Sequence, residues 1–254
     1  MVIRGGTYMK PNKSYTIWFS VRTGSTLLCK ALESTRVAGI PNEWLLTGQY
    51  NANNNPYDIQ QELWKKGTSD NGVLGIKFSM HNPCFNNIIK LFKQLPGGKE
   101  KKQDIHIWNN ALPNCKHIFM TRGNKVRLAV SWWRAIQSGE WGRRHGSKPK
   151  VADLVDKYSF DAINHLVMEC TMREAGIQEL FSQVNIIPFT IVYEDFILDY
   201  KNTVLSVLDY LDIEYDNSLH ICEPYFDRIA DGISEEWAQR FRKERQVGWD
   251  NIGW

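Results

Sequence analysis

The chain has 254 residues, and 43% of them are hydrophobic, so it can bury a sizeable interior as one domain over residues 1–254. Lysine and arginine total 31 against 28 aspartates and glutamates, a net charge of +3. This balance is too small to favour nonspecific nucleic-acid binding, although local basic clusters could still hold a dianionic nucleotide.

The sequence favours a cytoplasmic protein with at most peripheral membrane contact. No apolar run approaches the roughly 18 to 20 residues that span a bilayer, and the N-terminal segment lacks the apolar core of a signal peptide. The five cysteines are far apart and form no CxxC pair. A disulfide framework and a zinc site are therefore both disfavoured, and a reducing compartment is expected.

Apolar runs typical of strands alternate with longer helical patterns along the chain. Strands are expected at residues 15–19, 73–78, 117–121 and 186–192. Helices are expected at residues 25–33, 57–65, 85–94, 125–137, 151–181, 201–211 and 234–245. Turn formers and charges without periodicity predict loops at residues 51–56 and 96–103. The alternation predicts an α/β fold of three layers, P-loop-like, in which helices flank a central parallel sheet.

The segment YTIWFSVRTGSTLL, residues 15–28, has the pattern of a phosphate-binding loop. A strand leads into a turn with Arg22 and Gly24, and hydroxyl residues open the following helix. A helix start offers unpaired N–H groups and a positive dipole end, and glycine lets the backbone close around an anion. A nucleotide triphosphatase loop needs a second glycine and a lysine after it, whereas here Gly24 stands alone and the cation precedes it. A different phosphorylated donor is therefore indicated.

Ligands of open α/β sheets collect beyond the carboxyl ends of the strands, so the residues there are the candidates for chemistry. The first strand is followed by the loop residues 22–26. The second strand end carries Lys77, Ser79 and His81, and the third carries Thr121 and Arg122. The fourth carries Tyr193, Glu194 and Asp195. Taken singly, each of these could also be a helix cap or a surface ion pair.

The run VRTGSTLLCKALESTRVAGIPNEWL resembles the opening of bacterial sulfotransferases of the trehalose 2-sulfotransferase family. Three later segments are similar to the family in the same order: TRGNKVRLAVSWWRAIQSGEW, VYEDF and ADGISEEWAQRF. The resemblance covers nearly the whole chain. It implies direct in-line transfer of a sulfuryl group from 3′-phosphoadenosine-5′-phosphosulfate (PAPS) to a carbohydrate or glycolipid hydroxyl. No metal is expected, because the single charge of a sulfuryl group needs less neutralisation than a triphosphate and the sequence shows no acidic metal-binding pair. The resemblance also suggests a homodimer.

The resemblance assigns the first loop to the 5′-phosphosulfate of the donor. Backbone N–H groups and hydroxyls of Thr23, Gly24, Ser25 and Thr26 would bind this group. Arg22 would neutralise the phosphate as it leaves, because a guanidinium offers a planar two-pronged donor but does not readily give up a proton. An ordinary turn with a serine or threonine helix cap is the structural alternative.

A second group of residues would bind the 3′-phosphate of the donor. The resemblance implies that Arg122 and Ser131 bind it, and an arginine fork with a hydroxyl donor suits a phosphate dianion. A surface ion pair and a small residue at a helix contact are the alternative. Arg228 resembles a late loop that closes over the nucleotide, although Ile229 departs from the family pattern.

Transfer to a hydroxyl needs a base near the first loop. Glu43 falls where trehalose-type enzymes carry a glutamate that resembles a general base, and Pro41 should keep this segment out of a helix. His81 is the rival base, because an imidazole titrates near neutral pH. Trp44 is the candidate acceptor contact, since aromatic faces suit sugar C–H surfaces. Each residue has a structural alternative. Glu43 could be a solvated loop carboxylate, His81 a structural histidine and Trp44 a core residue.

Two other functions stay open at this point: a small-molecule kinase with a P-loop, which would need magnesium and ATP, and a noncatalytic nucleotide-binding protein. The acceptor is equally open, since trehalose, lipopolysaccharide and other glycans are all compatible with the sequence. Arg143 and Arg144, in the run WGRRHG, could meet an anionic ligand or belong to a solvated loop.

Overall fold

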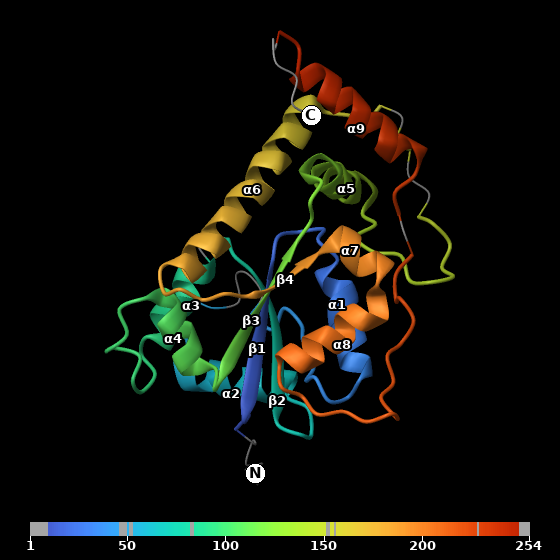
Figure 1. The fold of residues 1–254 in the computed structure, drawn as a ribbon. Coiled ribbons are helices and arrows are strands. Elements are labelled where there is room, and N and C mark those ends of the chain that lie inside the picture. Colours follow the sequence, from blue (N-terminus) through green and yellow to red (C-terminus); the bar gives the residue numbers. More distant parts are fainter. Residues whose placement is uncertain are drawn as a thin grey trace, which may run out of the picture.

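The computed structural model describes residues 10–45, 50, 53–81, 84–150, 153–154, 156–227 and 229–248 (Figure 1). Its centre is a four-stranded sheet in the order β2-β1-β3-β4, and all neighbouring strands are parallel. The strands are β1 (Lys13–Phe19), β2 (Val73–Ser79), β3 (Cys115–Thr121) and β4 (Phe189–Val192). The predicted α/β fold with a central parallel sheet is confirmed.

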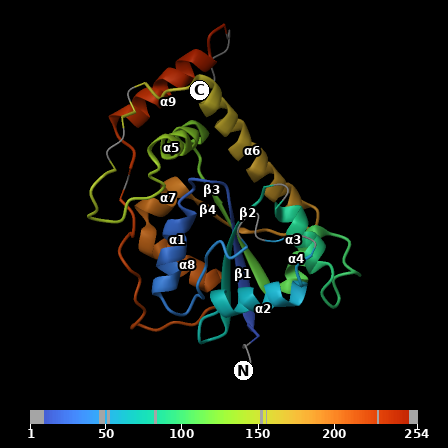
Figure 2. The same cartoon turned by 180° about the vertical axis from the view of Figure 1, so that it is seen from behind.

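The described helices are α1 (Ser25–Ser34), α2 (Pro56–Gly67), α3 (Cys84–Phe92), α4 (Asp104–Ala111), α5 (Lys125–Ser138), α6 (Phe160–Ser182), α7 (Tyr193–Leu198), α8 (Tyr200–Tyr210) and α9 (Gly232–Arg245). Side chains alternate along β1, so Trp18 packs with α2, α3 and α4, whereas Tyr15, Ile17 and Phe19 pack with α1 and α8. Figures 1 and 2 show these two groups of helices on opposite faces of the sheet.

A third apolar cluster joins α5, α6 and α9 beyond the carboxyl ends of the strands (Figure 2). The long helix α6 packs here through Ile163, Leu166 and Cys170, and its last turns reach the core on one face of the sheet through Ile177 and Leu180. These helices therefore form a roof over the edge of the sheet where ligands of such folds bind.

Several elements differ from the sequence expectation. Strand β4 begins at Phe189 instead of 186, because Pro188 has no N–H to donate to a sheet ladder. Helix α6 begins at Phe160, where the hydroxyl of Ser159 accepts the N–H of Ala162 as a cap. Helices α4 and α7 were not expected, because with eight and six residues they are too short to show a helical apolar period in the sequence.

Within the described segments, no helix is long and apolar enough to cross a membrane. All five cysteines lie in these segments, and none of them is paired with another.

Candidate active site

A cavity of about 1260 Å³ lies at the carboxyl ends of the strands, between the sheet and the roof of α5 and α9. The sequence-predicted site residues that line it are Arg22, Gly24, Ser25, Thr26, Glu43, His81, Arg122 and Ser131. Thr23 and Trp44 are described but do not line it. Arg228 lies outside the described residues. The strand ends therefore bring most of the candidates together in one place.

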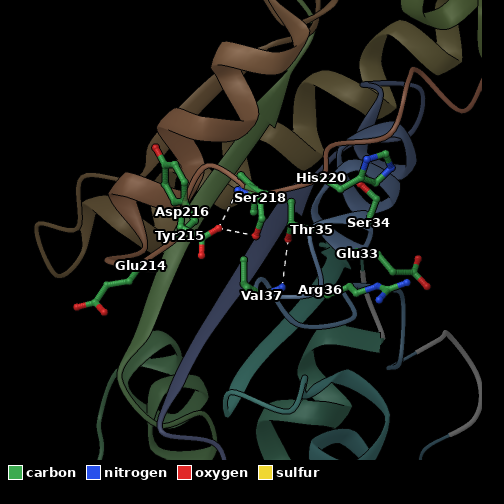
Figure 3. Close-up of a pocket in the computed structure, with 11 residues that line it drawn as sticks. Glu33, Ser34, Thr35, Arg36, Val37, Glu214, Tyr215, Asp216, Ser218 and His220 are labelled. Carbon is green, nitrogen blue, oxygen red and sulfur yellow. Dashed lines mark hydrogen bonds between the residues drawn. The ribbon is translucent and has the colours of Figure 1, made fainter.

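A smaller pocket of about 760 Å³ lies at the other end of α1 (Figure 3). It is formed by the last residues of that helix, the turn at residues 35–37 and the loop at residues 214–220. None of the candidate residues lines it. The candidate residues therefore gather in the larger cavity, where the strand ends and the helix starts converge.

The turn between β1 and α1 is shaped for an anion. Arg22 and Gly24 both have left-handed backbone conformations, with φ of 68° and 79°. No described side chain caps α1, whose N-cap is Gly24, so the first N–H groups of the helix stay open to a ligand. A Cβ on Gly24 would lie 2.7 Å from the ring of Tyr193, which requires a glycine there. The side chain of Thr23 is buried, and its hydroxyl donates to the carbonyl of Ser20 at 2.9 Å.

Arg22 crosses the cavity to α5. Its Nε donates to Oγ of Ser131 at 3.0 Å, and its Nη1 donates to the carbonyl oxygen of Trp141. Burial, and after it the charge of the nearby Arg122, lower the pKa of Arg22 to about 10. Two guanidinium groups therefore repel each other inside this cavity, an arrangement that an anion between them would stabilise.

Arg122 lies over the ring of Tyr193, with 4.7 Å between the guanidinium carbon and the ring centroid. Its Nε is 3.5 Å from Oε1 of Glu194 and, although buried, makes no hydrogen bond with the described residues. Burial lowers the pKa of Arg122. Burial would raise the pKa of Glu194, but the N–H groups of Gly123 and Asn124 and the charge of Arg122 hold that pKa below its usual value.

Lys77 connects the turn to Glu43. Its side chain is only 4% exposed and leaves the end of β2, and its Nζ lies 2.9 Å from Oγ1 of Thr26 and 2.8 Å from Oε1 of Glu43. The backbone N–H of Lys77 also donates to the carbonyl of Asn42 at 2.9 Å. The loop with the candidate base is thereby attached to the sheet. The sequence places Lys77, a lone lysine in the apolar strand VLGIKFS, among the strand-end candidates, and the structure adds its contacts to Thr26 and Glu43.

His81 and Trp44 are held by backbone contacts. Nδ1 of His81 lies 3.0 Å from the carbonyl oxygen of Ser79. Nε1 of Trp44 donates to the carbonyl of Ile40 at 2.8 Å, and its ring packs against the core cluster on the β2 side of the sheet. His81 lines the cavity, whereas Trp44 lies outside its lining.

The comparison with known proteins decides the family. A family model described as Stf0 sulphotransferase matches residues 14–244. The chain belongs to the Stf0 sulphotransferase family.

Two curated relatives of this Stf0 sulfotransferase are both called trehalose 2-sulfotransferase. The protein from Mycolicibacterium smegmatis is 28% identical over 268 residues, which cover 92% of this chain and 96% of the relative. The protein from Mycobacterium tuberculosis is 28% identical over 264 residues, which cover 91% of this chain and 95% of the relative. The predicted family and the predicted sulfotransferase activity are thereby confirmed.

Among solved structures, the sulfotransferase domain of the olefin synthase from Synechococcus PCC 7002 superposes on this Stf0 sulfotransferase with a TM-score of 0.42 and 15% identity. The superposition covers 95% of this chain and 91% of that domain.

The roof of the sulfotransferase cavity is closed by ion pairs between α5 and the start of α9. Nη2 of Arg127 lies 2.7 Å from Oε2 of Glu235, and Nη1 of Arg134 bonds Asp231. Asp231 also caps α9 by accepting the N–H of Ser234 at 3.1 Å. These two arginines line the cavity but already have carboxylate partners, whereas the partners of Arg22 among the described residues are Ser131 and the carbonyl of Trp141.

Arg143 and Arg144 have structural contacts. Arg143 forms two hydrogen bonds of 2.9 Å to the buried carboxylate of Glu140. The guanidinium of Arg144 lies 5.7 Å from the ring centroid of Tyr225, and its backbone pairs with Phe226. Arg144, together with the backbone carbonyl of Arg143, which accepts the N–H of Asp227 at 2.9 Å, attaches the loop after α5 to residues 225–227. Across the described part of the chain, no group of three or more histidine, cysteine, aspartate or glutamate residues could hold a metal ion.

Proposed function

We propose that this sulfotransferase uses PAPS as its donor and sulfates a hydroxyl of a carbohydrate or glycolipid by direct in-line transfer. The observation that carries the proposal is the double contact of Lys77, whose Nζ binds both Thr26 of the anion-binding turn and the carboxylate of Glu43. A donor group on that turn and a base for the acceptor would then lie within reach of one buried cation. The trehalose 2-sulfotransferase names of both relatives support a sugar acceptor, with trehalose the first candidate.

The residues of the cavity fit a donor with two anionic ends. The open N-terminus of α1, with Ser25 and Thr26, suits the 5′-phosphosulfate. Arg122 and Ser131 suit the 3′-phosphate, because the buried Nε of Arg122 makes no hydrogen bond with the described residues and the guanidinium fork matches phosphate oxygens. A phosphate there would also relieve the repulsion between Arg122 and Arg22.

In the proposed reaction, Glu43 accepts the proton of the acceptor hydroxyl, whose oxygen then forms a bond to sulfur. The bond between sulfur and the bridging oxygen of the donor breaks, and its electron pair stays on the 5′-phosphate. Arg22, Lys77 and the N–H groups of α1 stabilise the charge that develops on the sulfuryl and phosphate oxygens. The products are the sugar sulfate and 3′-phosphoadenosine-5′-phosphate (PAP), and the proton on Glu43 is released to solvent.

Isothermal titration with PAP tests the donor class. Runs in EDTA and parallel runs in magnesium, with ATP as the control ligand, are expected to show binding of PAP alone, and Arg122→Ala is expected to weaken it. Absence of PAP binding, or equal binding of ATP that requires magnesium, would overturn the proposal and favour the kinase alternative. Turnover of PAPS with trehalose and other glycans then identifies the acceptor.

The remaining expectations are part of the same proposal. The chain would form one sulfotransferase domain over residues 1–254, work in the cytoplasm without binding nucleic acid, and touch membranes at most peripherally. The unpaired cysteines support a reducing compartment. A homodimer is suggested by the family resemblance, and light scattering after size exclusion tests it.

A further inference from the structure

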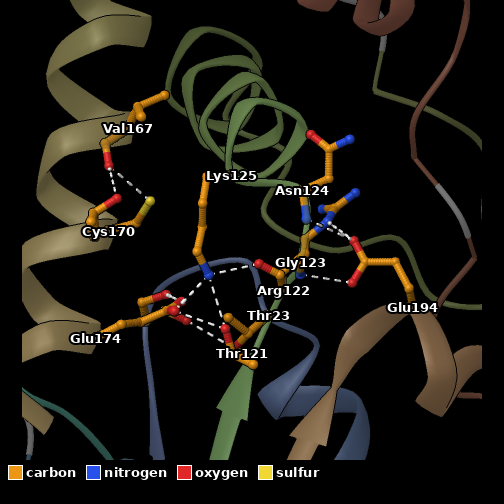
Figure 4. Close-up of polar contacts among 12 residues, drawn as sticks. Thr23, Thr121, Arg122, Gly123, Asn124, Lys125, Val167, Cys170, Glu174 and Glu194 are labelled. Carbon is orange, nitrogen blue, oxygen red and sulfur yellow. Dashed lines mark hydrogen bonds and ion pairs between the residues drawn. The ribbon is translucent and has the colours of Figure 1, made fainter. Parts of the chain in front are cut away.

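A buried carboxylate on α6 lies beneath the candidate donor site. Glu174 is 6% exposed and lies outside every segment that carries the family resemblance. Figure 4 shows it below the start of α5. Its Oε1 accepts the hydroxyl of Ser20 at 2.8 Å, its Oε2 accepts the hydroxyl of Thr121 at 2.7 Å, and Nζ of Lys125 lies 2.5 Å away.

Each of these three partners adjoins a turn that faces the cavity. Ser20 follows β1 directly, and its carbonyl accepts the hydroxyl of Thr23 inside the first turn. Thr121 is the last residue of β3 and precedes Arg122. Lys125 is the first residue of α5, and its Nζ also reaches the carbonyl of Arg122 at 2.7 Å. One carboxylate therefore joins the β1–α1 turn, the β3–α5 turn and α6.

A contribution to folding stability does not by itself account for the buried carboxylate of Glu174. Removing a charge from water costs several kcal/mol, and replacing a buried ion pair by packed apolar side chains is often neutral or stabilising. What the ionised group provides is a fixed geometry, because two carboxylate oxygens receive three donors from two separate turns. These are the turns that present Arg22 and Arg122, whose like charges push them apart.

We infer that Glu174 is a positioning residue that sets the spacing between the two anion-binding turns, and hence the fit of a nucleotide with phosphates at both ends. The inference rests on the proposed PAPS-dependent function. Glu174 does not line the cavity among the described residues and acts only through Ser20, Thr121 and Lys125. Loss of the Glu174 carboxylate should therefore weaken binding of the donor far more than binding of the acceptor.

The test compares Glu174→Gln with the wild-type enzyme in PAP titration, in kcat and KM for PAPS, in KM for the acceptor and in thermal unfolding. Glu179→Gln, on the exposed side of the same helix, is the matched control. We expect PAP affinity of Glu174→Gln to fall by about tenfold or more, since hydrogen bonds to a charged group are lost. The acceptor KM of Glu174→Gln should change less than about twofold, and so should the PAP affinity of Glu179→Gln.

A second pair of variants keeps the test decisive if Glu174→Gln does not fold. Thr121→Val keeps the shape of the side chain but removes one hydroxyl to Glu174, and Thr121→Ser restores it. PAP affinity should fall in the first and recover in the second. A lower melting temperature with unchanged PAP affinity and unchanged PAPS kinetics in these variants would overturn the inference alone. Failure of the wild-type protein to bind PAP would overturn the proposed function as well.

Discussion

Nζ of Lys77 lies 2.8 Å from the carboxylate of Glu43, and the two side chains differ sharply in exposure, at 4% for the lysine and 39% for the glutamate. Glu43 therefore faces the cavity, whereas the side chain of Lys77 is buried at the edge of the sheet. The position of the candidate base is set by β2, which carries Lys77, as well as by the loop in which Glu43 occurs.

Replacing Glu43 by glutamine should lower kcat for PAPS turnover by roughly 10²- to 10⁴-fold, the usual contribution of a general base. The shape of the side chain is retained, so PAP affinity measured by titration should stay close to that of the wild type. Glu33→Gln is a matched control, because Glu33 is also 39% exposed and also pairs with a lysine, at the far end of α1. Near-normal turnover of Glu43→Gln would contradict the assignment and direct attention to His81.

Lys77→Met should lower kcat by about 10- to 100-fold, through the loss of two charged contacts. Its melting temperature should stay the same or rise, because the variant no longer buries an ammonium group and Glu43 remains open to water. Lys77→Arg is expected to fold poorly, since a larger, forked group does not fit the same space. Enzyme assays alongside thermal unfolding separate these effects. Full activity of Lys77→Met would contradict the proposed role.

Arg122→Ala should weaken PAP binding by roughly 10- to 100-fold, because a guanidinium opposite a phosphate is lost. Arg122→Lys should recover only part of the affinity, since an ammonium group cannot form the two-pronged contact. Arg240→Ala is the control, because Arg240 lies on α9, bonds Glu244 and does not line the cavity. Titration of all three variants makes the comparison, and equal losses for Arg122→Ala and Arg240→Ala would argue against a specific phosphate contact.

Stability should fall in mild acid because of His117. Burial lowers the pKa of His117 to about 4, and Nδ1 of its ring accepts the indole N–H of Trp18 at 3.0 Å. The unfolded chain then takes up a proton near pH 6.5, where the folded protein does not, so the free energy of unfolding decreases as the pH falls from about 6.5 to about 4. Urea unfolding across this range is expected to show a loss on the order of 3 kcal/mol from this group.

The same experiment with His117→Gln should show a flatter pH dependence, whereas His106→Gln, at an exposed position on α4, should follow the wild type. A wild-type curve that is level between pH 6.5 and 4, or an unchanged slope in His117→Gln, would show that another group carries the acid sensitivity.

The sheet and most of the cavity wall could be predicted because both depend on local patterns. Apolar runs marked the strands, and the rule that parallel strand ends gather ligands placed Arg22, Arg122 and His81 at one edge. The boundaries were less accurate where a single residue overrode the pattern, as at Pro188 before β4 and Ser159 before α6.

The contacts of Lys77 and Glu174 could not be predicted in this way. Glu43 and Lys77 are 34 positions apart, and they meet only because the loop after α1 lies along the end of β2. Glu174 meets Ser20 across 154 positions, and its helix shows no site motif. The indole hydrogen bond of Trp44 to the carbonyl of Ile40 is a further contact that the sequence pattern does not indicate.

Tyr193 gives the cavity one further property. Its ring fills the space over Gly24 on one side and supports the guanidinium of Arg122 on the other. In the proposed complex, a ligand that shifts Arg122 would therefore also shift the ring that packs on the β1–α1 turn, where the other end of that ligand would bind. The site would then discriminate among adenine nucleotides by the spacing of their phosphates as much as by their number. A nucleotide with all its phosphates at the 5′ end would leave Arg122, on one side of the Tyr193 ring, without a phosphate partner.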